Sequence, residues 1–176
     1  MQAYHDTEWG VPCHDDARLF EMLILEGKQA GLSWALILKR RESMRAAFDG
    51  FDPEKMARYD DTKVAFLLQN DGIIKNRLKV TAAIRNAQAY LALRERFGSL
   101  DAFLWPYVEN TPIIGHWTEM GDMPTSTPLS NRLSKDLKKL GFSFVGNTIL
   151  YSFMQAVGMV NDHLLDCSFR RVPTGN

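Results

Sequence analysis

The chain has 176 residues, of which 45% are hydrophobic and 24% are charged, and its formal net charge is zero. This composition is typical of one ordinary globular domain. It excludes a membrane span, because no apolar run approaches the roughly 20 residues that a span requires. A neutral chain argues mildly against a nucleic-acid partner but does not exclude one, because local patches of charge decide binding.

The expected cellular setting follows from the N-terminus and the cysteines. Residues 1–10 lack the basic and apolar regions of a secretory signal. Two cysteines in a chain of this length do not form a disulfide framework. We therefore expect a cytoplasmic protein, active as a monomer, with no membrane partner.

Almost every segment carries a helical pattern. Capping residues, prolines at first helical positions and terminating glycines predict helices over 15–27, 33–48, 52–59, 60–70, 75–98, 99–108, 127–141 and 147–158. Residues 109–126 contain two prolines and two glycines, which predicts a long irregular loop. No alternating strand of useful length occurs. The predicted fold class is all-α, with a single domain over 1–176.

One acidic residue falls on an apolar stripe. Glu26 recurs at helical spacing with Leu19, Leu23 and Ala30 in the first predicted helix. A carboxylate is rarely buried without a partner, because removing it from water is costly. The position of Glu26 therefore requires an explanation.

Two explanations of Glu26 are open. Trp34 follows eight residues later across the turn GKQAGLS, and an acid and an indole beside a turn can form a flat, apolar pocket for a planar cationic base. The alternative is a structural ion pair between Glu26 and Lys28 or a distant arginine.

Residues 138–156, KKLGFSFVGNTILYSFMQA, are typical of a helix-hairpin-helix motif, which we place at about 130–158. A basic helix ends at Gly141, a short apolar turn follows, and a second helix begins at Asn147. Such a turn can lie close to a phosphate, and the second helix offers free backbone amides to an anion. A plain helical hairpin that ends at a glycine is the alternative.

The segment NDHLLDC places His163 and Cys167 one helical turn apart, a spacing that can present two ligands to one metal ion. His5 is a third candidate ligand. Cys13 and His14 are also available, but nothing in their placement selects them as a fourth. The alternative is a buried cysteine beside a surface histidine.

These patterns occur together, and together they resemble one family. The matching stretches are AYHDTEWGVP, LFEMLILEGKQAGLSW, FDPEKMA, DGIIKNRLKVTAAIRNA, PTSTPLSNRLSKDLKKLGFSFVG and VNDH with a cysteine four residues after its histidine. They run from Tyr4 to Cys167, essentially the whole chain. The sequence resembles bacterial DNA-3-methyladenine glycosylase I, a family of the helix-hairpin-helix glycosylase superfamily that repairs alkylated DNA.

The resemblance implies roles for particular residues. Glu26 matches the glutamate of the base pocket, and Tyr4 and Trp34 match aromatic residues that stack on the flipped base. The hairpin would grip the backbone of double-stranded DNA that contains 3-methyladenine. The implied DNA-binding residues are Leu32, Phe144, Gly146, Asn147 and Thr148. Leu32 is a candidate wedge for the gap left by the flipped base, and a buried loop leucine is the alternative.

The resemblance also implies a structural zinc ion held by His5, His163 and Cys167. It would tie together the segments at about 4–14 and 160–170. The family's fourth ligand, a cysteine upstream of the tyrosine, is absent from this chain, and Met1 stands in the place of a further pocket tyrosine. Either the sequence is shortened at its N-terminus, or the zinc site is incomplete and is finished by water.

The implied reaction is hydrolysis of the N-glycosidic bond. N3-methylation makes adenine cationic and a good leaving group, so the enzyme flips the nucleotide, holds the base between Tyr4 and Trp34 and lets water attack the sugar carbon. Glu26 would accept hydrogen bonds from the exocyclic amine edge; whether it also orients the water is open. The hairpin contains no lysine, which predicts a monofunctional glycosylase without lyase activity. Asp162 is expected to support His163 as a hydrogen-bond acceptor.

Two other functions are compatible with the sequence. A zinc-stabilised helix-hairpin-helix module that binds damaged DNA without catalysis is the main rival to the glycosylase. A small-molecule hydrolase with Glu26 as general base is disfavoured, because the sequence provides no nucleophile or pair of oxyanion donors.

Overall fold

A computed structural model describes residues 1–170 and is mostly helical, which confirms the predicted all-α class. The α-helices are α1 (Gln2–Thr7), α2 (Asp16–Gln29), α3 (Trp34–Lys39), α4 (Arg41–Ala47), α5 (Pro53–Met56), α6 (Asp61–Gln69), α7 (Arg77–Phe97), α8 (Leu100–Leu104), α9 (Pro128–Lys139) and α10 (Asn147–Ala156). Short 3-10 helices span Asp49–Phe51, Trp105–Val108 and Met120–Asp122. The last six residues of the predicted domain, 171–176, lie outside the described residues.

The structure adds two short strands to the predicted elements. β1 (Ile113–Ile114) lies in the loop predicted at 109–126, and β2 (Val160–Asn161) follows α10. They pair in parallel, with Ile113 opposite Val160. This pairing fixes the long loop beside the segment that carries His163. None of the described helices is long and apolar enough to cross a membrane.

The first long helix continues past its predicted end. The prediction ended it at Gly27, but α2 runs on to Gln29. A Cβ atom at Gly27 would lie 3.3 Å from the Cβ of Phe144, so this glycine allows a close approach of the hairpin rather than terminating the helix. α1, only six residues long, was not predicted at all.

The helix predicted over 33–48 is divided in two. Arg40 separates α3 from α4 with a backbone ψ of 2°. Its guanidinium donates hydrogen bonds to the carbonyl oxygens of Asp71 at 2.7 Å and Ile73 at 2.8 Å. This tertiary contact offsets the interrupted helix, and no local sequence pattern indicates it.

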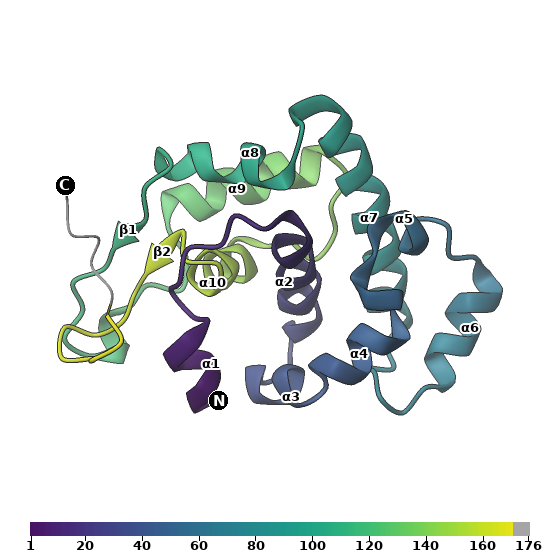
Figure 1. Cartoon of the computed structure of the whole chain (residues 1–176), viewed down its shortest axis with the longest axis horizontal. Helices are drawn as coiled ribbons and strands as arrows, with labels where there is room; N and C mark the ends of the chain where they lie inside the picture. The colour runs from purple at the N-terminus through teal and green to yellow at the C-terminus, as the bar shows by residue number, and fades with distance from the viewer. Residues whose placement is uncertain (171–176) are drawn as a thin grey trace.

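The long helix α2 runs through the middle of the molecule, with α10 on one side and α4, α5 and α7 on the other (Figure 1). α8 and α9 cover one end of this arrangement, and α1 and α3 lie at the other (Figure 1). The buried apolar side chains form one contiguous cluster that includes the predicted stripe residues Leu19 and Leu23, both almost fully buried. Glu26 lies on the same buried stripe, as predicted, with 3% of its surface exposed.

The predicted hairpin is present between α9 and α10. α9 begins with a capping box between Thr127 and Ser130, and Pro128 occupies its first turn. The turn that follows is fixed by side chains that bind its backbone. Ser134 donates to the carbonyl of Val145 at 2.6 Å, and Phe144 adopts a left-handed φ of 55°. The turn is therefore held in one conformation rather than left as a flexible link.

Candidate functional site

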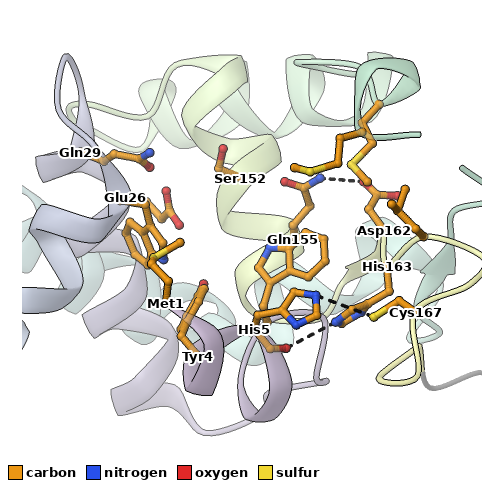
Figure 2. A pocket seen from close by; sticks show the side chains of 15 residues that line it. Met1, Tyr4, His5, Glu26, Gln29, Ser152, Gln155, Asp162, His163 and Cys167 are labelled. Atoms are coloured by element: carbon orange, nitrogen blue, oxygen red, sulfur yellow. Dashed lines mark hydrogen bonds between the residues drawn. The ribbon is translucent and has the colours of Figure 1, made fainter. Parts of the chain in front are cut away.

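A cavity of about 450 Å³ lies between α1, α2, α3, α10 and the segment after β2. Figure 2 shows Tyr4, Glu26 and Gln29 on one side of it and His5, His163 and Cys167 on the other. Its volume is in the range of small-molecule sites, and its lining is mainly apolar. The fold thus brings the predicted base-pocket residues and the predicted metal ligands to one hollow.

Glu26 enters this cavity as an uncompensated buried acid. Its Oε2 atom is inaccessible to solvent and has no hydrogen-bond partner among the described residues. Burial in this apolar setting raises the pKa of the Glu26 carboxyl to about 8. The free protein therefore keeps this group mainly protonated at neutral pH.

The ion-pair alternative for Glu26 is wrong. No described arginine or lysine pairs with it, and Lys28 is directed elsewhere: its ammonium group lies 4.3 Å from the centre of the Phe48 ring and 3.5 Å from the carbonyl oxygen of Lys79. Burial and the neighbouring Lys79 charge lower the pKa of Lys28 to about 7. Residues 1–170 therefore supply no partner for the buried oxygen of Glu26.

The aromatic residues form a corner rather than a slot. The ring centroids of Tyr4 and Trp34 lie 5.5 Å apart and the planes are inclined by 57°, so the rings contact each other. A planar base does not fit between them as they stand, which contradicts the predicted sandwich. A base can stack on one ring and meet the edge of the other.

A second hollow of about 200 Å³ opens from the same acid. Glu26, Gln29 and Ser152 line both hollows, and the second also contains Leu32 and Thr148. The half-buried Leu32 and the exposed start of α10 therefore lie beside one opening that leads to Glu26. The structure brings together the two segments predicted to contact DNA.

The predicted hairpin residues differ in where they point. Asn147 and Thr148 are exposed at the start of α10, and Gly146 is its N-cap without a side-chain hydrogen bond. The Thr148 amide donates to the Asn147 side-chain oxygen at 3.0 Å. Phe144 instead lines a small space beside Gly27 and Lys28. The side chain of Phe144 anchors the hairpin to α2, a role that the prediction missed.

Two polar residues of α7 fix the segments around the second opening. Lys79 donates hydrogen bonds to the carbonyl oxygens of Lys28 at 2.7 Å and Ala30 at 2.5 Å, at the C-terminal end of α2. Two helical turns further on, Asn86 exchanges hydrogen bonds with the backbone of Ser143 at 2.9 and 2.7 Å. One face of α7 thus binds both the segment before Leu32 and the hairpin, and it fixes the distance between them. The available sequence signal was a polar residue at two positions, Lys79 and Asn86, of the face that α7 buries.

The predicted metal ligands are close together. One ligand atom from each of His5, His163 and Cys167 lies within 4.8 Å of the others, and the Cys167 sulfur is 3.8 Å from His5 Nε2. Zinc bonds of roughly 2.0–2.3 Å to nitrogen and sulfur are compatible with this spacing. His14 is paired with Asp101 at 2.7 Å, away from the cluster. The three donors fit a zinc ion.

The prediction for Asp162 is wrong. The side-chain oxygen at His163 Nδ1 belongs to Asn161, at 2.8 Å. The Asp162 carboxylate accepts hydrogen bonds from Trp117 and Gln155 at 2.7 Å each and from Tyr151 at 2.6 Å.

Two further residues that line the cavity, Ser152 and Gln155, were not predicted as site residues. Both are polar residues on the largely apolar helix α10, one turn apart.

The pKa of Glu26 predicts a pH-dependent stability. The carboxyl has an ordinary pKa of 4.5 and a folded-state pKa of about 8. Between these values unfolding releases a proton, so the free energy of unfolding falls as pH rises, by at most about 1.4 kcal/mol per pH unit. Glu26→Gln removes this slope and should be more stable than the wild type at neutral pH, with the difference vanishing below pH 4.5.

Urea denaturation at a series of pH values measures this difference. Glu95→Gln, at an exposed position of α7, is the matched control and should follow the wild type. Wild-type and Glu26→Gln curves that run parallel from acid to neutral pH would contradict the burial argument.

Comparisons with known proteins agree with the geometry. A model of the methyladenine glycosylase family matches residues 1–171. DNA-3-methyladenine glycosylase 1 of Escherichia coli is 52% identical over 165 residues, which cover 94% of this chain and 88% of that protein. The Haemophilus influenzae DNA-3-methyladenine glycosylase is 47% identical over 164 residues, covering 93% and 89%.

Solved structures show the same fold. A crystal structure of 3-methyladenine DNA glycosylase I matches with a TM-score of 0.93 at 52% identity, covering 95% of this chain and 92% of that one. The Staphylococcus aureus enzyme, described for its recognition of 3-methyladenine, matches with a TM-score of 0.95 at 38% identity, covering 97% and 91%. The chain belongs to the methyladenine glycosylase family.

Proposed function

We propose that this protein removes 3-methyladenine from alkylated DNA by hydrolysing the N-glycosidic bond, as a monofunctional glycosylase. The observation that carries the proposal is Glu26, a buried acid that has no partner among residues 1–170 and lies at the wall of a base-sized apolar cavity. Relatives that bear the name of this activity are about half identical over nearly the whole chain. The family and the chemistry of the site support the same reaction.

The charge of the lesion explains why an unpaired acid suits this cavity. A 3-methyladenine nucleotide carries a positive charge on its base. When that base enters, the pKa of Glu26 falls, and the ionised carboxylate accepts a hydrogen bond from the base's amine. An undamaged adenine is neutral and offers no charge to compensate the buried carboxylate. Glu26 thereby favours the damaged base.

The reaction then moves the charge. As the N-glycosidic bond breaks, its electron pair goes to the base and the sugar carbon gains oxocarbenium character. A water molecule attacks this carbon, forms the new C–O bond and loses one proton to solvent. The base becomes neutral, so its electrostatic attraction to Glu26 is lost and its release is favoured. The base needs no protonation, because the electron pair of the broken bond neutralises its charge.

The second hollow gives the nucleotide a route to Glu26. In this proposal the exposed start of α10, at Asn147 and Thr148, binds the DNA backbone. Leu32 occupies the gap in the base stack. The hairpin, residues 142–146, contains no lysine that could form an imine with the sugar, so strand cleavage is not expected.

The zinc ion has a structural role in the proposal. His5 on α1 and His163 and Cys167 after β2 would hold it, so that it joins the two ends of the described chain beside the cavity. When bound, a zinc ion with these ligands supplies a cross-link between distant segments rather than a reactive group. Because His5 follows Tyr4, holding His5 also positions the Tyr4 ring.

Release of free 3-methyladenine from methylated double-stranded DNA tests the proposed reaction. The wild type should release the base, and Glu26→Gln should do so at least about a hundredfold more slowly, because the amide cannot supply the charge that the cationic base requires. Glu95→Gln, distant from the cavity, is the control. A wild type that binds this DNA but releases no base would support the rival binding module; equal release by both proteins would show that Glu26 contributes nothing.

Metal analysis tests the zinc site. Cys167→Ala should lower the affinity for zinc by roughly a hundredfold, since each ligand supplies a share of the roughly 10–16 kcal/mol of a structural site. Cys13→Ala is the matched control, because that cysteine lies outside the three-residue cluster. Equal zinc content in wild type and Cys167→Ala, measured by elemental analysis after dialysis, would refute the ligand assignment.

A further inference from the structure

A buried carboxylate that the proposed reaction leaves unused lies at the wall of the cavity. Asp162 is 1% exposed, and all three of its hydrogen-bond donors come from other segments: Trp117, Tyr151 and Gln155. The site is tightly packed, because a Cβ atom at Gly115 would lie 2.3 Å from Asp162 Oδ1. Asp162 is therefore held in place, and it can only accept hydrogen bonds from these three donors.

The fixed carboxylate determines which way the Gln155 amide faces. The Gln155 nitrogen donates to Asp162 Oδ2 at 2.7 Å. A reversed amide would set the Gln155 oxygen against that carboxylate oxygen, so the observed orientation is enforced. Figure 2 shows the Gln155 nitrogen directed at Asp162 and its oxygen turned into the cavity, toward the side of Ser152 and Glu26. No described residue donates a hydrogen bond to this oxygen.

We propose that Gln155 is a specificity-determining residue, which presents a permanent hydrogen-bond acceptor to the flipped base and thereby selects adenine over guanine. This inference rests on the proposed glycosylase function. An unrestrained glutamine would not discriminate, because its amide can rotate to offer either a donor or an acceptor. Asp162 removes that freedom.

The chemistry of the two lesions explains how a fixed acceptor can distinguish them. 3-Methyladenine and 3-methylguanine nucleotides carry the same positive charge, so the charge of Glu26 attracts both. They differ along one edge of the ring: at C6 adenine has an amine that donates and guanine has an oxygen that only accepts, and guanine also carries an N1 hydrogen and a C2 amine. In the cavity, two acceptors, Glu26 and Gln155, would face the group at C6. The two N–H groups of the adenine amine can satisfy acceptors, whereas the guanine oxygen is left facing one of them.

The test uses DNA methylated so that it contains both 3-methyladenine and 3-methylguanine. The ratio of their initial release rates from one reaction is independent of the fraction of active protein. Gln155→Met keeps the length of the side chain but removes the acceptor, and should lower the preference for 3-methyladenine by about tenfold. Asp162→Asn should also lower it, because the Gln155 amide can then rotate. Gln69→Met, at an exposed position of α6, should leave the ratio unchanged.

The outcomes separate the inference from the function on which it rests. A wild type that releases neither base overturns the proposed function. A wild type that prefers 3-methyladenine and a Gln155→Met variant with the same preference overturn the role of Gln155 alone. A lower preference in Gln155→Met but not in Asp162→Asn overturns the locking role of Asp162.

Discussion

The burial of one acid without a partner is the constraint on which this site depends. An ionised carboxylate in an apolar wall is unstable, so Glu26 stays protonated until a bound cation stabilises its ionised form. Such an arrangement weakens the free protein at neutral pH, and proteins keep strained or unsatisfied groups mainly where function requires them. For Glu26, the positive charge of the methylated base compensates the cost of burying the carboxylate. The group that destabilises the free protein is thus the group that recognises the lesion.

The rest of the fold keeps this acid in place and gives DNA access to it. α2 is buried along the stripe that carries Glu26, and its C-terminal end is fixed by Lys79. Asn86 on the same helix face fixes the hairpin at Ser143. Because both contacts come from one rigid helix, the wedge candidate and the hairpin keep a constant separation at the mouth of the second hollow. The segments proposed to bind DNA and the cavity that contains Glu26 therefore belong to one packed unit.

The sequence predicted the helices better than the contacts between them. Periodicity located α2, α7, α9 and α10, and the stripe that contains Glu26 was visible because helical spacing is local. Three features depended on distant residues and were not predictable: the break at Arg40, the passage of α2 through Gly27, and the acceptor of the His163 ring. The sandwich of Tyr4 and Trp34 was wrong for the same reason, since spacing along a chain gives no angle between two rings.

The resemblance to a family supplied what physical patterns could not. From the residues alone, the acid on the stripe, the hairpin and the histidine–cysteine pair each had an ordinary structural explanation. Their co-occurrence favoured one function, and the structure brings the acid and the metal candidates to one cavity. Gln155 escaped notice because its meaning depends on Asp162, which is adjacent only after the chain folds.

A direct titration of the Glu26 carboxyl tests the central claim. In carbon-13 NMR spectra of the free wild-type protein, the side-chain carboxyl signal that disappears in Glu26→Gln identifies the group, and its shift against pH gives the pKa. We expect a midpoint near pH 8, far above the ordinary glutamate value of 4.5. A midpoint near 4.5 would show a carboxylate that is solvated or paired, and would contradict an acid held in reserve for a cationic base.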